Sequence, residues 1–178
     1  RWIASEDFMA VPSKGYRRLF PGNMARLRYG YVVKCIGCDK DENGKVVAVH
    51  CEYLPETKSG TPGADSVKVK GNLHWVSAAQ SYAAEIRLYE RLFKVPAPGS
   101  RREGDAPELE RDFLDDLNPD SVQTISAQLE PCLREAGPEE RFQFERHGYF
   151  VADRVDSRPG APVFNRAVTL KDSWGKAG

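Results

Sequence analysis

The feature that most constrains the fold is a short turn signal between two β-type runs. Residues 46–53 are rich in β-branched and aromatic side chains, and so are residues 26–36 before them. Such side chains favour the pleated surface of a strand. Between the two runs stands Asn43-Gly44, a pair that favours the two positive-φ positions of a tight hairpin turn. The pattern predicts an antiparallel hairpin, and hence a β-sheet, in this part of the chain.

Further β-type segments follow at similar spacing, separated by Pro- and Gly-rich turns: 67–76, 85–93, 122–129, 141–152 and 163–170. The spacing of apolar residues in 85–93 fits a helix as well as a strand. In 141–152, Phe142 and Phe144 point to one face, and Gly148 marks a position for a β-bulge. About seven short strands of this kind predict an all-β fold built as one or two β-barrels.

An acidic segment interrupts the strand pattern. Residues 101–120 hold eight acidic and three basic side chains, a net charge of −5. Pro107 fits the first turn of a helix, and Asn118-Pro119 would end one. We therefore predict a short helical insertion of about two turns over 107–117.

The charge of the chain is balanced overall but not locally. The whole sequence has 26 basic and 26 acidic side chains, whereas residues 8–38 have six basic side chains and no acidic one. Guanidinium groups bond phosphates and base edges, and aromatic rings stack on unpaired bases. The basic segment mixes these cations with aromatic residues that include Tyr16, Phe20, Tyr29 and Tyr31. This mixture predicts a surface that binds single-stranded RNA.

The cysteines offer one pattern that could bind a metal. Cys35 and Cys38 form a Cys-x-x-Cys pair, and His50-Cys51 follows it, so four zinc ligands are available in principle. Adjacent residues on a strand point to opposite faces, however, which makes it hard for His50 and Cys51 to share a metal. With Cys132 there are four cysteines, too few for a disulfide scaffold. We expect free thiols and no metal.

No catalytic signature is recognisable in the sequence. It lacks a Gly-rich phosphate loop and a Gly-x-Ser-x-Gly elbow, and its three histidines, His50, His74 and His147, match no familiar arrangement with a nucleophile. We expect no catalytic residue. Since no apolar run approaches the roughly 20 residues of a membrane span, we also expect a cytoplasmic protein with no membrane partner.

Six motifs carry more information than the periodicity: Tyr16-Arg17-Arg18-Leu19, Arg26-Leu27-Arg28, the run 69–79 (VKGNLHWVSAA), the run 85–93 (EIRLYERLF), the run 142–150 (FQFERHGYF) and Pro162-Val163-Phe164-Asn165-Arg166. In this order and at this spacing they closely resemble the C-terminal anticodon-binding region of bacterial glutaminyl-tRNA synthetases, which are class I aminoacyl-tRNA synthetases. The resemblance spans nearly the whole chain. Residues 100–112 form a longer segment than in the relatives, and the resemblance gives them no role.

The resemblance implies an architecture and partners. It implies a complete distal β-barrel over 13–98 and a partial proximal β-barrel over 1–12 and 99–178. The chain would be monomeric and would bind the anticodon loop of the glutamine tRNA. An upstream catalytic domain of the same polypeptide, absent from this chain, would attach glutamine with ATP and magnesium. The chain itself would need no cofactor.

The resemblance also implies which residues bind the bases. Arg18 corresponds to the family's contact to the third anticodon base. Arg26 and Arg28 correspond to its contacts around the first base, and Gln143 with Arg146 to its reader of the central uracil. A Gln side chain suits that role, since it can both donate and accept hydrogen bonds, as the mixed edge of uracil requires.

Three neighbouring residues complete the expected RNA-binding set: Lys14, Tyr16 and Arg17. Arg17 stands where relatives often have Lys, which keeps the charge and adds a planar fork. Gly15 stands where some relatives have Gln, so a side-chain contact made there is lost.

Two alternative functions fit the sequence in part. One is a β-barrel that binds ribosomal RNA, in the manner of a ribosomal protein family with a similar barrel. It would not need the pair Gln143 and Arg146. The other is a zinc-stabilised protein-interaction module that uses the acidic insertion.

Overall fold

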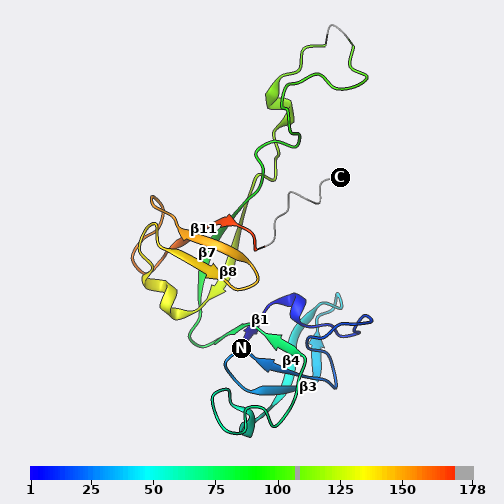
Figure 1. The fold of residues 1–178 in the computed structure, drawn as a ribbon, viewed down its shortest axis with the longest axis vertical. Coiled ribbons are helices and arrows are strands. Elements are labelled where there is room, and N and C mark those ends of the chain that lie inside the picture. Colours follow the sequence, from blue (N-terminus) through cyan, green and yellow to red (C-terminus); the bar gives the residue numbers. More distant parts are fainter. Residues whose placement is uncertain (107–108, 171–178) are drawn as a thin grey trace. The chain divides into compact units, whose positions relative to one another are not determined.

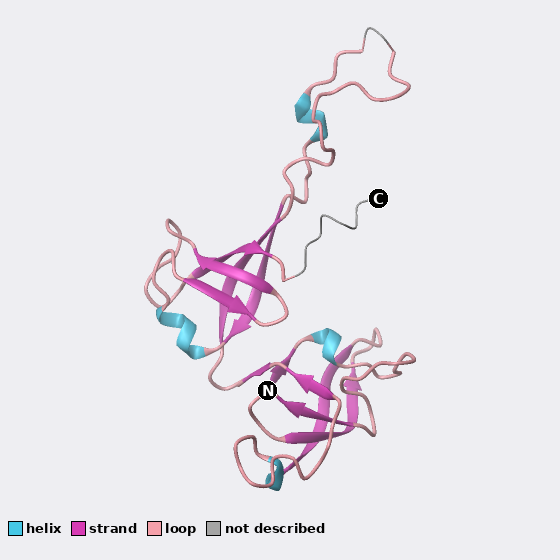
Figure 2. Ribbon diagram, viewed as in Figure 1, coloured by secondary structure: helices cyan, strands magenta, loops and turns pink. Residues whose placement is uncertain are grey.

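The computed structural model describes residues 1–106 and 109–170 and consists mainly of β-strands (Figures 1 and 2). The prediction of an all-β fold is confirmed. The chain divides into two compact units, residues 1–80 (unit 1) and 81–178 (unit 2). Helix in the described residues is limited to four short 3-10 segments: η1 (Ser5–Asp7), η2 (Pro55–Thr57), η3 (Phe113–Asp116) and η4 (Pro131–Glu135).

Unit 1 is built on a four-stranded sheet with the order β4-β3-β2-β5. Its strands are β2 (Met24–Leu27), β3 (Val32–Lys40), β4 (Val46–Leu54) and β5 (Gly71–Leu73). β3 is antiparallel to both β2 and β4, whereas β5 runs parallel to β2. A two-stranded sheet completes the unit, formed by β1 (Trp2–Ile3) and β6 (Trp75–Val76).

The predicted strand over 26–36 is two strands in the structure. β2 ends at Leu27, β3 begins at Val32, and the chain reverses between them. In this turn Tyr29 has a φ of 57°, and Gly30 donates its N–H to the Leu27 carbonyl at 2.7 Å. A tyrosine rarely adopts a positive φ, so the aromatic content of the segment concealed the turn.

The hairpin at Asn43-Gly44 is confirmed, but its turn geometry differs from the prediction. Of the described residues in this turn, only Gly44 has a positive φ, 77°. The loop is held by Asp41, whose carboxylate accepts hydrogen bonds from the N–H groups of Asn43 at 3.0 Å and Lys45 at 2.9 Å. A loop closed by a side chain therefore replaces the expected two-residue turn.

The core of unit 1 anchors both ends of a basic loop. Phe8 and Leu19 form an isolated parallel bridge and are buried in one apolar cluster with Ala25 and Leu73. Most residues between the two anchors, 9–18, are exposed. The loop is thus fixed at its ends while its polar side chains face solvent.

Unit 2 is a five-stranded sheet with the order β8-β7-β11-β10-β9 (Figure 1). Its strands are β7 (Tyr82–Tyr89), β8 (Val122–Leu129), β9 (Arg141–Phe144), β10 (Gly148–Ala152) and β11 (Val163–Val168). β7 and β11 run parallel, and the other neighbours are antiparallel.

Most strand predictions outside the β2–β3 turn are confirmed, although the strands begin or end at other residues than predicted. The segment 122–129 is confirmed as β8. Residues 85–89 of the ambiguous segment 85–93 lie in a strand, β7, and residues 163–168 of the predicted strand 163–170 form β11. The predicted strand 67–76 is shorter and is interrupted at His74, between β5 and β6.

The predicted strand over 141–152 is a hairpin of two strands, β9 and β10. An irregularity does lie beside Gly148, because the register between β10 and β11 shifts between Tyr149 and Phe150. Gly148 opens the second strand with a φ of 137°, and a Cβ at this position would lie 2.4 Å from the Val168 carbonyl oxygen. Glycine is therefore needed for the close approach of two backbones, a requirement that sequence cannot distinguish from a bulge.

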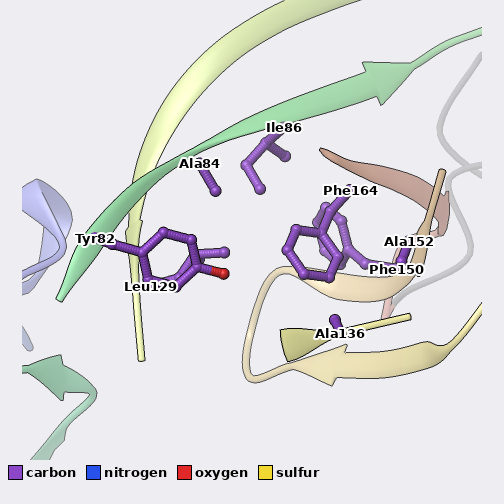
Figure 3. Close-up of a cluster of buried hydrophobic side chains, with 8 residues drawn as sticks. All are labelled: Tyr82, Ala84, Ile86, Leu129, Ala136, Phe150, Ala152 and Phe164. Carbon is purple, nitrogen blue, oxygen red and sulfur yellow. The ribbon is translucent and has the colours of Figure 1, made fainter. Parts of the chain in front are cut away.

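The core of unit 2 combines aromatic rings with smaller aliphatic side chains (Figure 3). Phe164 is fully buried, and its ring lies 5.7 Å from that of Phe142 and 5.3 Å from that of Phe144 between centroids. Phe144 also stacks on Phe150 at 4.3 Å. The prediction that Phe142 and Phe144 face inward is confirmed.

The acidic insertion contains less helix than predicted. Residues 107–108 lie outside the described residues, and the helix in the rest of 107–117 is one 3-10 segment, η3. Asp112 caps η3 through its carboxylate, which accepts from the Leu114 N–H at 2.9 Å. Asp116 is buried, where it accepts from the Gly99 N–H at 3.0 Å and pairs with Arg102. These contacts lower the pKa of Asp116. The side chains of Asp112 and Asp116 thus bond to backbone groups and close loops, and such bonds compete with helix formation.

The expectation of barrels is not confirmed, because the sheets of both units are open among the described residues. The described structure forms compact units that divide after residue 80, and the division into a distal barrel over 13–98 and a proximal barrel over 1–12 with 99–178 stays a prediction. β1 pairs with β6 inside unit 1, and β7 pairs with β8 and β11 inside unit 2. Strand pairing therefore places the boundary after residue 80.

Candidate nucleic-acid interface

The basic loop of unit 1 holds Arg18 against a buried carboxylate. The Nη1 atom of Arg18 lies 2.8 Å from Asp7 Oδ1, and the Asp7 side chain is fully buried while 38 % of the Arg18 side chain is exposed. Arg18 and Tyr16 also both donate to the Glu6 carbonyl, at 3.3 and 3.0 Å. The guanidinium is therefore oriented by the core and still reaches the surface. Asp7 lies just before the acid-free segment, so the sequence did not link the two.

A cavity of about 610 Å³ lies beside this loop. Tyr16, Arg17 and Phe20 line one part of it, and the Tyr16 and Phe20 rings are 6.4 Å apart. Lys68 and Lys70 line another part. The cavity thus combines rings on which a base can stack with three cations that can bind phosphate.

Lys68 and Lys70 are candidate site residues that the sequence reasoning missed. Both are exposed, and the alternating Val67 and Val69 are half-buried. This alternation places the two lysines on one face, and it was visible in the sequence as Val-Lys-Val-Lys. What the sequence could not reveal is that this face borders the loop of residues 14–18.

Arg26 organises a neighbouring loop. Its Nη1 atom donates to the carbonyl oxygens of Thr57 at 2.7 Å and Gly30 at 3.3 Å and to Ser59 Oγ at 3.4 Å, and its Nη2 atom donates to the Ala64 carbonyl. Arg26 also lines a cavity of about 480 Å³. Much of the hydrogen-bonding capacity of this expected base contact is thus used within the protein.

Replacing Arg26 by lysine should loosen the loop of residues 57–64. An ammonium group cannot reproduce the planar fork, and a hydrogen bond to a charged group contributes about 1.5–3 kcal/mol. We expect the Ser59 N–H, which bonds the Gly30 carbonyl at 2.9 Å, to exchange at least about tenfold faster. The matched control is Arg17→Lys at an exposed position. Equal protection in both variants would contradict the role assigned to Arg26.

The half-buried Arg28 and the exposed Tyr29 form a pair at the turn between β2 and β3. Arg28 lies over the Tyr29 ring at 4.9 Å and donates to the Tyr29 hydroxyl at 3.1 Å. Tyr29 is 79 % exposed and has a positive φ. The backbone of Arg28 is tied to the sheet, because its carbonyl accepts from Trp75 Nε1 at 2.9 Å and its N–H donates to Leu73. Tyr29 thus has a strained backbone conformation and an exposed ring on a rigid support. Such a ring is suited to stacking on an unpaired base.

The third group of expected site residues lies on the β9–β10 hairpin of unit 2. Gln143 is exposed on β9, on the face opposite the buried rings of its neighbours, and pairs across the strands with Tyr149. Arg146 is exposed in the connecting turn and has a φ of 68°. Tyr149 is 47 % exposed, and sequence reasoning did not select it. The hairpin therefore carries an amide, a guanidinium and a phenol ring on its exposed surfaces.

The expected site residues divide between the units. Gln143 and Arg146 belong to unit 2 and the others to unit 1. Within unit 1, Tyr16 and Arg17 line one cavity while Arg26 lines another. Lys14 is exposed in the basic loop.

The residues considered for zinc do not form a common site. His50 Nε2 lies 2.8 Å from Asp39 Oδ2, and Cys35 pairs across the sheet with Cys51. In the described part of the chain, no group of three or more His, Cys, Asp or Glu side chains is placed to hold a metal ion. Nor does any helix there have the length and hydrophobicity to span a membrane.

Comparison with known proteins identifies relatives along almost the whole chain. The glutamine–tRNA ligase of Cupriavidus necator is 67 % identical over 98 % of the chain, and that of Ralstonia nicotianae is 65 % identical over 98 %. The glutamine–tRNA ligase of Bordetella pertussis is 60 % identical over 97 %. The chain covers only 28–29 % of the length of these three relatives. The two alternatives, a ribosomal RNA-binding barrel and a zinc-stabilised module, find no support among these matches.

Two family models also match, at residues 2–54 and 72–153. Both are described as the anti-codon binding domain of class I tRNA synthetases (E and Q). The two matched segments contain the basic loop, the β2–β3 turn and the β9–β10 hairpin. With its all-β fold and its arginine-, lysine- and tyrosine-bearing surfaces, the chain belongs to the anticodon-binding domain family of class I tRNA synthetases for glutamate and glutamine.

Proposed function

We propose that this chain is the anticodon-reading part of a glutamine-tRNA ligase and binds the anticodon loop of the glutamine tRNA. The observation that carries the proposal is the 60–67 % identity with glutamine–tRNA ligases over at least 97 % of the chain. Identity this high over nearly the whole chain favours glutamine over glutamate as the amino acid of the parent enzyme.

The chemistry of unit 1 supports binding to an RNA loop. Single-stranded RNA is held by phosphate contacts and by stacking of its splayed bases on rings or guanidinium planes. Exposed positive charge is provided by Lys14, Arg17, Lys68 and Lys70. Tyr16 provides a ring at the cavity that Arg17, Lys68 and Lys70 line. We assign phosphate contacts to these cations.

We assign the three anticodon bases as the family resemblance implies. Arg18 contacts the third base, Arg26 and Arg28 act at the first base, and Gln143 with Arg146 reads the central uracil. In this proposal unit 1 corresponds to the distal barrel and unit 2 to the proximal barrel.

The proposal includes a longer parent protein. A catalytic domain upstream of this chain would use ATP and magnesium to attach glutamine to the tRNA, and the fragment would supply no catalytic group. The enzyme would act in the cytoplasm as a monomer.

Binding to a panel of tRNAs that differ only in the anticodon tests the proposal. We expect the glutamine tRNA to bind at least about tenfold more tightly than variants with a changed middle base, since a specific base contact contributes on the order of 1–3 kcal/mol. Equal affinity for all anticodons would contradict the proposal.

Salt should weaken binding even though the net charge of the chain is zero. If about four phosphates are neutralised, the slope of log K against log salt should be near −3, at roughly −0.7 per contact for single strands. The measurement is a titration with glutamine tRNA at several salt concentrations. An affinity independent of salt would exclude the phosphate contacts assigned to unit 1.

A further inference from the structure

Cys35 and Cys51 face each other across two strands of unit 1. They are direct partners in the antiparallel register of β3 and β4. Cys35 donates its N–H to the Asn23 carbonyl and accepts at its own carbonyl from the Gly22 N–H, each at 2.9 Å. The hydrogen-bonding groups of Cys35 thus point away from β4. The two cysteines therefore form a non-hydrogen-bonded pair, the type in which opposite Cα atoms approach to about 4.5 Å.

This register suits a covalent link between the two sulfur atoms. Disulfides join residues whose Cα atoms are roughly 4.4–6.8 Å apart and whose Cβ atoms point the same way. Directly opposite residues of an antiparallel pair meet both conditions. Cys38, by contrast, is paired with Val49, and Cys132 lies in unit 2.

The two thiols differ in access. Cys35 is fully buried in the core cluster, whereas Cys51 is exposed on β4, the edge strand of the sheet. Partial burial of the Cys51 thiol, the charge of Cys35 and a hydrogen bond between the two raise the pKa of Cys51 to about 11. An oxidant can thus reach Cys51 first, but the reactive thiolate is scarce at neutral pH.

We propose that Cys35 and Cys51 are a site of reversible thiol oxidation, at which a small disulfide such as oxidised glutathione converts the pair into a cross-strand disulfide. The Cys51 thiolate attacks the small disulfide, forms a mixed disulfide and releases one glutathione thiol. Cys35 then loses its proton and attacks the Cys51 sulfur, which releases the second glutathione. The protein loses two hydrogen atoms, that is two protons and two electrons, and one glutathione disulfide becomes two thiols.

The test is incubation of the full chain with oxidised glutathione in alkaline buffer, followed by mass spectrometry of the intact protein and of its peptides. The background is Cys38→Ala with Cys132→Ser, so that only the proposed pair can react. We expect a loss of two hydrogen masses, a peptide link between Cys35 and Cys51, and full reversal by a thiol reductant. Accumulation of glutathione on Cys51 without a link to Cys35 would overturn the proposal, as would no reaction at all.

Two single variants in that background separate the roles of the thiols. Cys35→Ala removes the resolving thiol, so we expect the glutathione adduct to persist on Cys51. Cys51→Ser removes the accessible thiol, so Cys35 should stay unmodified. A persistent glutathione adduct on Cys35 in the Cys51→Ser variant would contradict the mechanism. It would show that the exposure of the thiols does not determine which one reacts first. The wild-type chain serves as a second measurement: a link from Cys35 to Cys38 in its peptide map would also overturn the proposal.

Discussion

Replacing Arg146 by alanine is expected to weaken binding of the glutamine tRNA at least about tenfold, which corresponds to a loss of about 1.4 kcal/mol. Arg146 is exposed in the turn at the tip of the β9–β10 hairpin, and Gln143 is exposed on the adjoining strand β9. If Gln143 and Arg146 both bind the central uracil, Arg146→Ala should lower the affinity for the glutamine tRNA. It should also reduce the discrimination between uracil and cytosine at the middle position. Filter binding or fluorescence titration with the two anticodon variants measures both quantities.

Two control variants distinguish base reading from simple attraction. Lys14→Ala removes an exposed charge from the basic loop and should weaken all tRNAs by the same factor, because a phosphate contact carries no base information. Arg141→Ala removes an exposed charge from the same hairpin and should leave the discrimination unchanged. If Arg146→Ala lowered the affinity for every anticodon equally, Arg146 would be an electrostatic anchor and its assigned role would be wrong.

Replacing Phe164 by alanine should lower the free energy of unfolding of unit 2 by about 3–5 kcal/mol. Phe164 is fully buried in the apolar cluster of unit 2 (Figure 3). Its ring lies 5.7 Å from that of Phe142 and 5.3 Å from that of Phe144 between centroids. The substitution removes these contacts and leaves a cavity between β7, β9 and β11 that a sheet cannot close without breaking its register. Amide exchange of the strands of unit 2 measures this loss directly.

The matched control lies on the same strand. Val168 is 57 % exposed at the end of β11, so Val168→Ala should change the stability by less than about 0.5 kcal/mol. If Phe164→Ala and Val168→Ala lowered the free energy of unfolding by similar amounts, the aromatic cluster would not determine the stability of unit 2.

The strands that could be predicted are those whose signal is contained in their own residues. β4 and β8 were found because β-branched and alternating residues extend over the whole strand, and β3 and β4 were linked by Gly44 in a short loop. The β2–β3 and β9–β10 turns were missed because Tyr29 and Arg146 adopt a positive φ without being Gly or Asn. Tertiary contacts must offset the cost of that conformation, and a local pattern does not contain them.

The candidate site was predictable in its residue types and not in its arrangement. The arginines and the basic loop were visible as an acid-free segment, and the resemblance to a synthetase family assigned them to bases. The partners that orient them were not visible: Asp7 beside Arg18, and the carbonyl oxygens of Thr57 and Ala64 around Arg26. These partners are separated in sequence by up to 38 residues, so only the folded chain brings them together.

By itself the sequence determined that this protein is all-β, where most of its strands lie and which family its surfaces resemble, because strand propensity, turn residues and motif order are local properties. Only the tertiary structure decided that β7 and β11 run side by side in parallel, that Lys68 and Lys70 share a cavity with Arg17, and where the two units divide. Each of these depends on pairing between distant segments. Such pairing is selected by burial of the core of each unit, and not by the preferences of either segment alone. Leu19 is a buried core residue of unit 1 and Phe164 of unit 2.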